Sequence, residues 1–375
     1  MRGFHAGCVK MTHPALGLLV SSNDIGCGNL KNLSLNLGQS RGILLTRLKS
    51  IGDIVFTLPA VHSVRAAFPD ARITYLVSQE YVPLLEGFRD VDGIIGLDRA
   101  RFRRFSLTST LREGFRVLRM LRREKFAVAI DFQGYGETAL LTWCTGAAMR
   151  WGITRSRVRR RAYTYVIPRD NSIHPANCNL ELLQRAGVQP GSIRNEFVIP
   201  VTALDGARRF CLERGLQPQR PMLLLQPFTS SFEKNWPVEK YLAVARHWKE
   251  RGVQVLFSGG PADREALAPV REAGFQVSAG VPLLTSAALA SLCAVVIGGD
   301  TGLLHLAVAM GKRVLMIMQS NAPGSTHPFE HKDWTVLPRS GESISSITVA
   351  SVNSDCAQAL AELGFHDLGT DVRPR

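Results

Sequence analysis

Short aliphatic runs alternate with stretches of helical spacing from residue 41 onward, a pattern typical of parallel α/β folds. In the first half of the chain, strands are predicted at Gly42–Arg47, Arg72–Val77, Gly93–Leu97 and Phe126–Phe132, with helices at Asp53–Phe68 and Leu107–Arg123. Strands and helices in this order join parallel neighbours through right-handed crossovers. The first half therefore predicts a doubly wound sheet.

The same alternation starts again after a proline-containing region around residues 190–200. Strands are predicted at Pro221–Gln226, Val253–Ser258, Phe275–Ser278, Ala294–Gly298 and Arg313–Met318, and helices at Val238–Arg251, Ala262–Ala273, Leu283–Cys293 and Gly302–Met310. Open α/β sheets bind ligands at the carboxyl ends of their strands. We expect an α/β protein with two doubly wound, Rossmann-like domains that face each other across a cleft.

The 375 residues divide accordingly into four parts. Residues 1–40 show no clean periodicity and are predicted to form a flexible N-terminal extension, and residues 41–195 form the first domain. Residues 196–345 form the second domain, and residues 346–375 a C-terminal helix and tail. The amphipathic stretch Ile347–Leu363 is expected to pack back onto the first domain. The apolar run Ala15–Val20 is too short to span a bilayer, so we do not expect this chain to be an integral membrane protein.

Composition and cysteine usage suit a globular protein in a reducing compartment. Hydrophobic residues make up 45% of the chain and charged residues 20%, the balance of an ordinary folded domain. The seven cysteines are scattered and include no C-x-x-C pair, so neither a disulfide framework nor a zinc site is indicated. We expect a cytoplasmic protein.

The net charge of +14 is concentrated in two arginine-rich segments. Residues 99–125 contain ten basic and two acidic side chains, and residues 150–161 contain six basic and no acidic ones, so the two segments account for the whole excess. A positive field confined to one region favours an anionic partner. The alternatives are a solvated basic face and a nucleic-acid-binding protein. Because no helix-turn-helix or zinc signature is present, we do not expect a nucleic-acid partner.

Asp53 is the candidate general base. It ends the segment R-L-K-S-I-G-D at residues 47–53, directly after the first strand, where the next helix begins. An aspartate at this position can instead cap the helix and complement its macrodipole. The turn carries neither G-x-G-x-x-G nor a Walker motif, so it is not an ordinary dinucleotide cradle. That absence favours a catalytic role for the acid.

A glycine-rich turn in the second domain is a candidate diphosphate site. After the strand Ala294–Gly298, the sequence G-G-D-T-G-L-L-H begins a helix, and free backbone amides at a helix N-terminus bind anions. The residues of interest are Asp300, Thr301, Gly302 and His305. The alternative is that Asp300 only caps the helix and that His305 is a core histidine with satisfied hydrogen bonds.

Two further loops follow strand ends on the same predicted edge. Residues 229–237, T-S-S-F-E-K-N-W-P, supply the hydroxyls of Thr229 and Ser230 and the positive charge of Lys234. Hydroxyls donate to phosphate oxygens, and a lysine neutralises a departing diphosphate. The turn S-G-G-P at residues 258–261, which contains Gly259, ends another strand. These loops extend the predicted anion site along the rim.

Five motifs at strand ends occur in order: I-L-L-T-R-L-K-S-I-G-D-I-V-F-T-L-P-A (43–60), D-F-Q-G (131–134), T-S-S-F-E-K-N-W-P (229–237), S-G-G-P-A-D (258–263) and G-G-D-T-G-L-L-H-L-A (298–307). Together they resemble the ADP-heptose:lipopolysaccharide heptosyltransferases, glycosyltransferase family nine, over most of the chain. The resemblance implies a two-domain GT-B fold, inverting transfer from an ADP-sugar, and a diphosphate leaving group that needs no metal.

The resemblance also implies a role for each motif residue. Asp53 would take the proton from the acceptor hydroxyl, Lys234 with Thr229 and Ser230 would hold the pyrophosphate, and Asp300 would contact the donor sugar. Thr301 and Gly302 would supply phosphate-binding amides, and Gly259 and His305 complete the predicted donor site. Because the nucleotide-sugar is a substrate, no cofactor and no metal are expected.

On the acceptor side, the resemblance implies that the N-terminal domain binds a phosphorylated, anionic lipopolysaccharide core. The predicted acceptor-binding residues are Arg101, Arg103, Arg104, Arg112 and Arg116. The same basic region is expected to make peripheral contact with the cytoplasmic face of the inner membrane.

Two loops near the predicted donor site depart from the family pattern. Residues 319–324 read Q-S-N-A-P-G in place of a G-P-T-type turn, and Thr229–Glu233 lacks an arginine often found there. Another nucleotide or sugar therefore stays open. A sugar-nucleotide epimerase or dehydrogenase is disfavoured, because no glycine fingerprint follows the first strand and no Tyr-x-x-x-Lys pair is evident.

Overall fold

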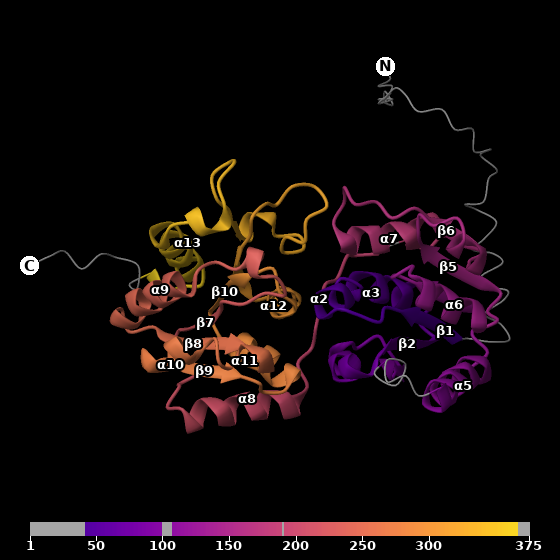
Figure 1. The fold of residues 1–375 in the computed structure, drawn as a ribbon, viewed down its shortest axis with the longest axis horizontal. Helices are drawn as coiled ribbons and strands as arrows, with labels where there is room; N and C mark the ends of the chain where they lie inside the picture. The colour runs from indigo at the N-terminus through magenta and orange to yellow at the C-terminus, as the bar shows by residue number, and fades with distance from the viewer. Residues whose placement is uncertain (1–41, 100–106, 190, 367–375) are drawn as a thin grey trace, which may run out of the picture.

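The computed structural model describes residues 42–99, 107–189 and 191–366, without the side chains of residues 107–111. These residues form two domains, each built on one parallel six-stranded sheet with helices on both faces (Figure 1). The predicted fold class of two doubly wound α/β domains is confirmed. The predicted extension over residues 1–40 lies outside the described residues, as do Arg101, Arg103 and Arg104.

The first sheet has the strand order β3-β2-β1-β4-β5-β6, and all neighbouring strands are parallel. β1 is buried after its first residue, as expected for a central strand covered on both faces. With η marking 3₁₀ helices, the elements are β1 (Gly42–Thr46), α2 (Ile51–Val55), α3 (Leu58–Ala67), β2 (Arg72–Ser78), η1 (Gln79–Gly87), β3 (Gly93–Leu97), α5 (Leu107–Arg123), β4 (Val128–Asp131), α6 (Gly136–Cys144), β5 (Met149–Ile153), η2 (Arg159–Ala162), β6 (Tyr165–Ile167) and α7 (Pro175–Arg185).

The second sheet has the order β12-β11-β10-β7-β8-β9 and is also parallel throughout. Its central strands β7 and β10 are buried at every residue. The elements are α8 (Val201–Glu213), β7 (Met222–Gln226), η3 (Phe232–Lys234), α9 (Val238–Glu250), β8 (Gln254–Gly259), η4 (Pro261–Asp263), α10 (Ala268–Glu272), β9 (Gln276–Ala279), α11 (Leu283–Leu292), β10 (Val295–Gly299), α12 (Gly302–Ala309), β11 (Arg313–Ile317), η5 (Lys332–Trp334), β12 (Thr335–Val336), η6 (Ile344–Ser346) and α13 (Val349–Glu362).

Both sheets reverse their strand order beside their first strand, and this topology fixes where ligands bind. β1 lies between β2 and β4, and β7 lies between β8 and β10. Loops that leave such a switch point diverge to opposite faces and open a crevice at the carboxyl edge. The loop after β1 borders one crevice, and the loops after β7 and β10 border the other. Figure 1 shows α2 and α12 side by side where the domains meet, and the two helices are in contact.

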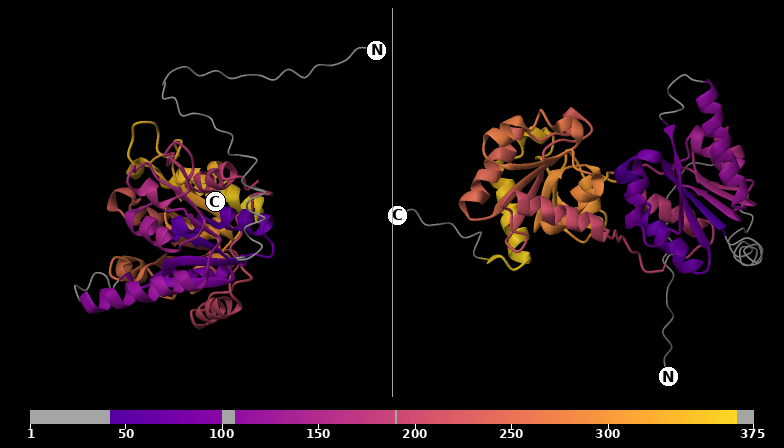
Figure 2. Two further views of the ribbon diagram at one scale, coloured as in Figure 1. Left: turned by 90° about the vertical axis from the view of Figure 1, so that its right-hand side faces the viewer. Right: turned by 90° about the horizontal axis from the view of Figure 1, so that it is seen from below.

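The expectation that the C-terminal helix packs onto the first domain is wrong. The buried side chains of α13, among them Val352 and Cys356, belong to a core that contains Trp236 and Tyr241 of the second domain. The indole of Trp236 also donates a hydrogen bond of 3.0 Å to the Ile347 carbonyl. The apolar side of α13 therefore covers α9, and Figure 2 shows this yellow helix within the second domain.

Two predicted helices are each broken by a proline. The predicted helix at residues 53–68 is split into α2 and α3, where Pro59 stands at the start of α3 and Thr57 Oγ1 donates to the Ile54 carbonyl at 2.7 Å. The predicted helix at residues 262–273 is split into η4 and α10, with Pro269 at the start of α10. Proline lacks the amide that would continue a helix, so it favours a new first turn instead.

Several elements fall where the sequence pattern predicts none. They are α6, β5, β6 and α7 between residues 136 and 185, together with α8 and β12. β6 has three residues and β12 has two, too few to show a periodicity. β5 reads M-R-W-G-I, and its arginine interrupts the aliphatic run that marks the other strands.

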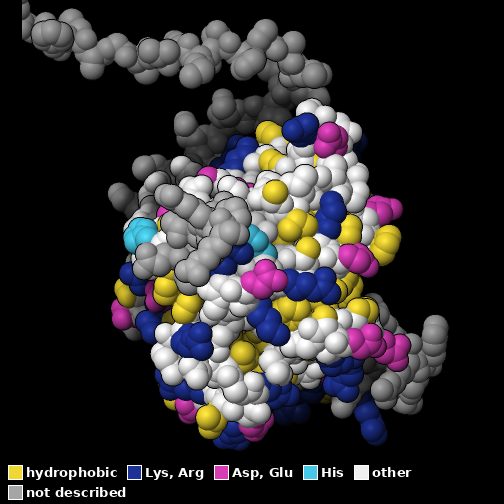
Figure 3. Space-filling view, turned by 90° about the vertical axis from the view of Figure 1, so that its left-hand side faces the viewer, with side chains coloured by type: hydrophobic (Ala, Val, Ile, Leu, Met, Phe, Trp, Pro, Cys, Tyr) yellow, Lys and Arg dark blue, Asp and Glu magenta, His cyan; other side chains and the backbone are white. Residues whose placement is uncertain are grey.

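The excess of positive charge lies in the first domain. The described parts of the basic segments are Arg99, residues 107–125, which contain α5, and residues 150–161, which contain most of β5 and η2. By contrast, the outer face of the second domain mixes basic and acidic side chains (Figure 3). Within the described ranges, no helix combines the length and apolar character needed to cross a bilayer.

Candidate active site

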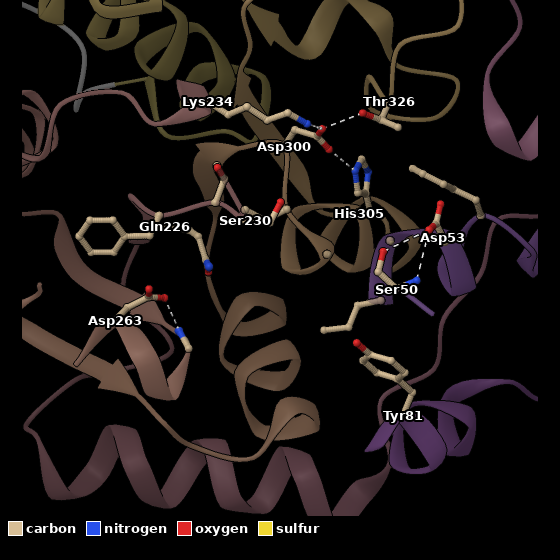
Figure 4. Close-up of a pocket in the computed structure, with 18 residues that line it drawn as sticks. Ser50, Asp53, Tyr81, Gln226, Ser230, Lys234, Asp263, Asp300, His305 and Thr326 are labelled. Atoms are coloured by element: carbon tan, nitrogen blue, oxygen red, sulfur yellow. Dashed lines mark hydrogen bonds and ion pairs between the residues drawn. The ribbon is translucent and has the colours of Figure 1, made fainter. Parts of the chain in front are cut away.

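A cavity of about 490 Å³ lies between the two domains, where their switch points face each other. The first domain contributes Ser50, Ile51, Gly52, Asp53, Phe56 and Tyr81. The second domain contributes Gln226, Phe228, Thr229, Ser230, Lys234, Gly260, Asp263, Asp300, Thr301, Gly302, His305 and Thr326. In Figure 4, Asp53 and Ser50 approach the cavity from the first domain, and Lys234, Asp300 and His305 approach it from the second.

Asp53 presents one anchored and one open carboxylate oxygen. Its Oδ2 pairs with Arg47 Nη2 at 2.7 Å and accepts from the backbone amide and hydroxyl of Ser50 at 3.2 and 3.3 Å. No described residue donates a hydrogen bond to Oδ1, and about a third of the side chain is exposed. Asp53 thus caps the first turn of α2 through one oxygen and leaves the other to accept a proton. The capping and catalytic interpretations are compatible.

The D-F-Q-G turn after β4 holds the loop that carries Asp53. Arg47 Nη1 donates to the Phe132 carbonyl at 3.0 Å, and the amide of Leu48 donates to Gln133 Oε1 at 2.8 Å. The turn is itself organised by the buried Asp131, which accepts from the amides of Gln133 and Gly134 and from Tyr163. The motif therefore positions the active-site loop from behind.

Gly134 in this turn requires its glycine. It adopts a φ of +68°, and a Cβ there would lie 1.7 Å from the carbonyl oxygen of Ile153. A side chain would be strained by the left-handed backbone and would clash with β5. The sequence of the turn is thus set by backbone geometry as well as by hydrogen bonding.

Asp300 lies at the centre of a charged network on the second domain. Its Oδ1 is 2.9 Å from His305 Nε2, while Oδ2 is 3.1 Å from Lys234 Nζ and accepts from Thr326 Oγ1 at 2.8 Å. Burial tends to raise the pKa of Asp300, but the bonds from His305 and Thr326 and the charge of Lys234 outweigh it and hold that pKa well below its usual range. Asp300 is therefore a carboxylate, and His305 Nε2 carries the proton.

Asp300 stands one residue before the N-cap of α12. The residue that caps α12 is Thr301, whose hydroxyl faces the amide of Leu304 at 3.5 Å, so the helix-cap interpretation of Asp300 is wrong. His305 is buried, as a core histidine would be, but it also lines the cavity. Its Nδ1 has no hydrogen-bond partner among the described residues.

The predicted residues of the loop after β7 all line the cavity, but they differ in whether their polar groups are free to bind a ligand. Thr229 Oγ1 donates to the Ser231 carbonyl at 2.8 Å, so its hydroxyl is engaged inside the loop. Ser230 is exposed, and the Lys234 side chain is about half exposed. Ser230 and Lys234 are therefore the groups of this loop that a ligand can reach.

Gly259 does not line the cavity, whereas its neighbour Gly260 does. Gly259 is the last residue of β8 and is buried, and a Cβ there would lie 2.8 Å from Leu267 Cδ1. The backbone amide of Gly260 donates to Asp263 Oδ2 at 2.7 Å. The predicted donor-binding role of Gly259 thus receives no support from its position.

The N-terminus of α12 packs directly against α2 of the first domain. A Cβ on Gly302 would lie 2.6 Å from Ile51 Cβ, and a Cβ on Gly52 would lie 3.0 Å from the His305 ring. The Phe56 ring meets the His305 ring edge-on, with 4.6 Å between centroids. The absence of side chains at these two glycines allows the domains to approach.

Replacing Gly302 by alanine is expected to lower kcat/KM about 10- to 100-fold, because overpacking costs about 1–3 kcal/mol and pushes the domains apart. Alanine keeps the backbone amide, so the change tests packing rather than anion binding. Combining Gly302→Ala with Ile51→Gly, which removes the clashing atoms, should restore part of the loss. Steady-state kinetics measures both effects. Wild-type kcat/KM in the single variant would show that the contact does not matter.

Several cavity residues come from segments where the sequence pattern indicates no site. Tyr81 lies in η1 after β2, Gln226 ends β7, and Thr326 lies in the loop after β11. Gln226 stands at the carboxyl end of a strand and the other two follow one, and this position is the signal that would have found them. Burial, the largest influence, raises the pKa of Tyr81, so this phenol stays protonated at neutral pH.

Arg112 and Arg116 do not line the cavity. Arg112 is exposed on α5, and Arg116 pairs with the buried Glu113 on the same helix and donates to the Gly96 carbonyl at 2.7 Å. Their predicted role in acceptor binding remains a prediction. No cluster of three or more His, Cys, Asp or Glu side chains that could hold a metal ion is present in the part of the chain described.

Two doubly wound domains that face each other across a cavity, with Asp53 on one side and Lys234 and the N-terminus of α12 on the other, have the architecture of GT-B glycosyltransferases. The family model described as glycosyltransferase family 9 (heptosyltransferase) matches residues 115–346. The chain belongs to this family of enzymes.

Individual relatives agree with this assignment. Lipopolysaccharide heptosyltransferase 1 of Pseudomonas aeruginosa is 27% identical over 294 residues, which cover 76% of this chain and 80% of the relative. A family 9 glycosyltransferase of Veillonella parvula matches 86% of this chain and 97% of its own with a TM-score of 0.77 and 22% identity. Escherichia coli heptosyltransferase WaaC with ADP matches 85% and 99% with a TM-score of 0.71 and 20% identity. The two structures show the GT-B fold.

Proposed function

We propose that this glycosyltransferase transfers a heptose from ADP-heptose to a phosphorylated lipopolysaccharide inner-core acceptor, with inversion at the anomeric carbon and Asp53 as general base. The observation that carries the proposal is the shared cavity, where Asp53 faces Lys234 and the N-terminus of α12. The names of the relatives, lipopolysaccharide heptosyltransferases and WaaC with ADP, support the donor and the acceptor class.

The open oxygen of Asp53 supports the proposed proton transfer. The acceptor hydroxyl oxygen forms a bond to the anomeric carbon while the bond from that carbon to the diphosphate oxygen breaks. The hydroxyl proton goes to Asp53 Oδ1, and the bonding pair leaves with the diphosphate. Because Arg47 and Ser50 engage only Oδ2, the carboxylate keeps a fixed orientation during the transfer. A positioned base of this kind contributes ~10²–10⁴-fold to a rate.

The second domain supplies positive charge where the diphosphate would develop its negative charge. Lys234 is a cation at the rim, Ser230 is an accessible hydroxyl, and the amides of Thr301 and Gly302 lie at the N-terminus of α12. Preorganised donors stabilise such charge without reorganising during the reaction. Asp300, held by its three partners, would accept a hydrogen bond from a hydroxyl of the donor sugar.

We expect transfer from ADP-heptose to proceed unchanged in excess EDTA, because Lys234 and the helix amides take the place of a metal at the diphosphate. Activity should be measured as ADP release with a lipopolysaccharide-core acceptor, with and without the chelator. Calorimetry with ADP-, UDP- and GDP-sugars identifies the donor, and ADP-heptose should bind most tightly. Loss of activity in EDTA with recovery on adding Mg²⁺ would contradict metal independence. Tighter binding of a UDP- or GDP-sugar would show that the donor is not ADP-heptose.

On the acceptor side, we propose that the basic first domain binds the anionic glycolipid while the protein makes peripheral contact with the cytoplasmic face of the inner membrane. The location of the excess positive charge in this domain supports the proposal, since phosphorylated sugars and anionic lipids both attract arginine. Arg112 and Arg116 are the described residues assigned to acceptor binding.

A further inference from the structure

We infer that the outward face of α5, α6 and η2 is a docking surface for an anionic phospholipid bilayer, into which Phe115, Leu140 and Trp143 insert. The inference deepens the proposed function by naming the surface and the side chains that would contact the membrane. It rests on the proposed function only in identifying this bilayer as the membrane that carries the glycolipid acceptor.

Large apolar side chains stand exposed on this face. Phe115 of α5 is 67% exposed, Leu140 and Trp143 of α6 are 58% and 56% exposed, and Val158 beside η2 is 76% exposed. Leu118 of α5 is also exposed, at 36%. Single exposed apolar residues are ordinary, but a group on neighbouring elements marks an interaction surface.

The three elements form one continuous face. α5 and α6 cover the same side of the first sheet, where Val117 and Leu121 share a core with strand residues and the partly buried Leu141. Arg122 of α5 donates to the Cys144 carbonyl at the end of α6, and η2 in turn contacts α6. Side chains of α5 and α6 that point away from the sheet therefore point to the same side of the molecule, and η2 lies beside α6.

Arginines surround the apolar side chains. The exposed ones on α5, η2 and the residues before η2 include Arg112, Arg119, Arg123, Arg157, Arg160 and Arg161. Fewer acids than arginines are exposed here, because Glu113 is buried against Arg116. Glu137 pairs with Arg99 at 3.2 Å, and the exposed Glu124 lies 3.8 Å from Arg72. The surface thus combines apolar insertion with positive charge.

This combination fits a bilayer better than a nucleic acid or a protein partner. Arginine binds lipid phosphates, tryptophan is enriched at membrane interfaces, and phenylalanine and leucine bury in the acyl boundary. A nucleic acid would use the arginines but gain little from an exposed leucine and valine. Among the described residues of this face, the exposed arginines outnumber the exposed acids Glu124 and Glu137, and this excess favours an anionic partner.

The face also leads to the active-site loop. α6 begins three residues after Gln133, which accepts a hydrogen bond from the amide of Leu48 in the loop that carries Asp53. The N-terminal end of α6 therefore lies beside the turn that supports the loop of Asp53. Docking and catalysis remain separate functions, because none of the proposed insertion residues lines the cavity.

Vesicle flotation of the full chain tests the inference. We expect binding to vesicles in which about a third of the lipid is phosphatidylglycerol, and little binding to phosphatidylcholine alone. Phe115→Ser with Trp143→Ser should lower partitioning about tenfold or more, and so should Arg119→Gln with Arg123→Gln. The matched control is Val201→Ser with Leu212→Ser, two exposed apolar residues of α8 that are 73% and 80% exposed, and it should bind like the parent.

Tryptophan fluorescence gives a second readout that does not depend on loss of binding. Trp143 is the most exposed of the five tryptophans, since Trp151, Trp236 and Trp248 are buried and Trp334 is partly buried. Lipids brominated in the acyl chain should quench the parent protein, and Trp143→Phe should remove the quenching while flotation persists.

The inference is overturned if the surface variants float like the parent protein, if neutral vesicles bind equally well, or if quenching survives Trp143→Phe. It is also overturned if the parent protein does not bind anionic vesicles but binds RNA or DNA, and if the same surface variants lose that nucleic-acid binding. Transfer to a lipid-free core oligosaccharide is measured separately on the Phe115→Ser/Trp143→Ser variant and should stay at the parent rate. Failure of transfer in the parent would reject the proposed function and leave the vesicle result unaffected.

Discussion

Replacing Asp53 by asparagine is expected to lower the rate of sugar transfer by ~10²–10⁴-fold, the contribution of a positioned general base. Asparagine has nearly the same shape and can still accept the amide hydrogen of Ser50, but it cannot take a proton from the acceptor hydroxyl. Donor affinity should change little, because the diphosphate groups lie on the second domain. Single-turnover kinetics and calorimetry with ADP separate the two quantities.

The controls for Asp53→Asn distinguish catalysis from helix capping. Ser50→Ala removes one hydrogen bond to Oδ2 but leaves the acid, so most of the activity should remain. Asp205→Asn makes the same chemical change on the exposed surface of α8 and should leave the rate unaltered. If Asp53→Asn lowers the melting temperature while transfer stays at the parent rate, Asp53 is a helix cap and the proposed mechanism is wrong.

Replacing Lys234 by alanine is expected to weaken binding of ADP about 10- to 100-fold, the loss of one hydrogen bond to a charged group. The transfer rate should fall as well, because the same cation stabilises the charge of the departing diphosphate. Asp300 keeps its bonds from His305 and Thr326, so the network should survive the change. Calorimetry with ADP measures the affinity.

Lys249→Ala on α9 is the matched control for Lys234→Ala, since it removes an exposed lysine outside the cavity. It should bind ADP like the parent protein. Lys234→Arg keeps the charge and should recover part of the affinity. An unchanged dissociation constant for ADP in Lys234→Ala would remove this lysine from the diphosphate site.

The parts of the site that follow strand ends could be predicted from the sequence. Asp53, Lys234 and Asp300 each stand a few residues after a recognisable aliphatic strand, and parallel strands bring their carboxyl ends to one edge. The order of the strands could not be read in the same way. Tyr81 and Thr326 line the cavity because the sheets pair β1 with β2 and β10 with β11, and these pairings depend on contacts distant in sequence.

Local sequence also failed to show which hydrogen bonds a candidate residue would make. Thr229 and Ser230 are adjacent hydroxyls, yet the Thr229 hydroxyl donates inside its own loop and Ser230 stays accessible. Gly259 and Gly260 are adjacent glycines, yet only Gly260 lines the cavity. The direction in which each residue points at the end of its strand decides such differences. That direction depends on the register of the strand within the folded sheet.

In the arginine-rich part of the first domain, the local pattern does not reveal a strand either. The strand Met149–Ile153 contains an arginine whose side chain donates to the carbonyls of Ala147 and Ala162. These hydrogen bonds allow a charged residue to occupy a strand, but the local pattern of hydrophobic and polar residues does not predict them. The apolar stripe of the C-terminal helix does not specify its partner, and contacts with α9, which is distant in sequence, decide where the helix packs.

The most direct measurement is a crystal structure of the protein with an ADP-heptose analogue that carries fluorine at the sugar C2, which slows departure of the diphosphate. The diphosphate should lie against Lys234 and the amides of Thr301 and Gly302, with the anomeric carbon between it and Asp53 Oδ1. A nucleotide bound outside the cavity between the domains, or a sugar whose anomeric carbon faces away from Asp53, would contradict the proposed mechanism.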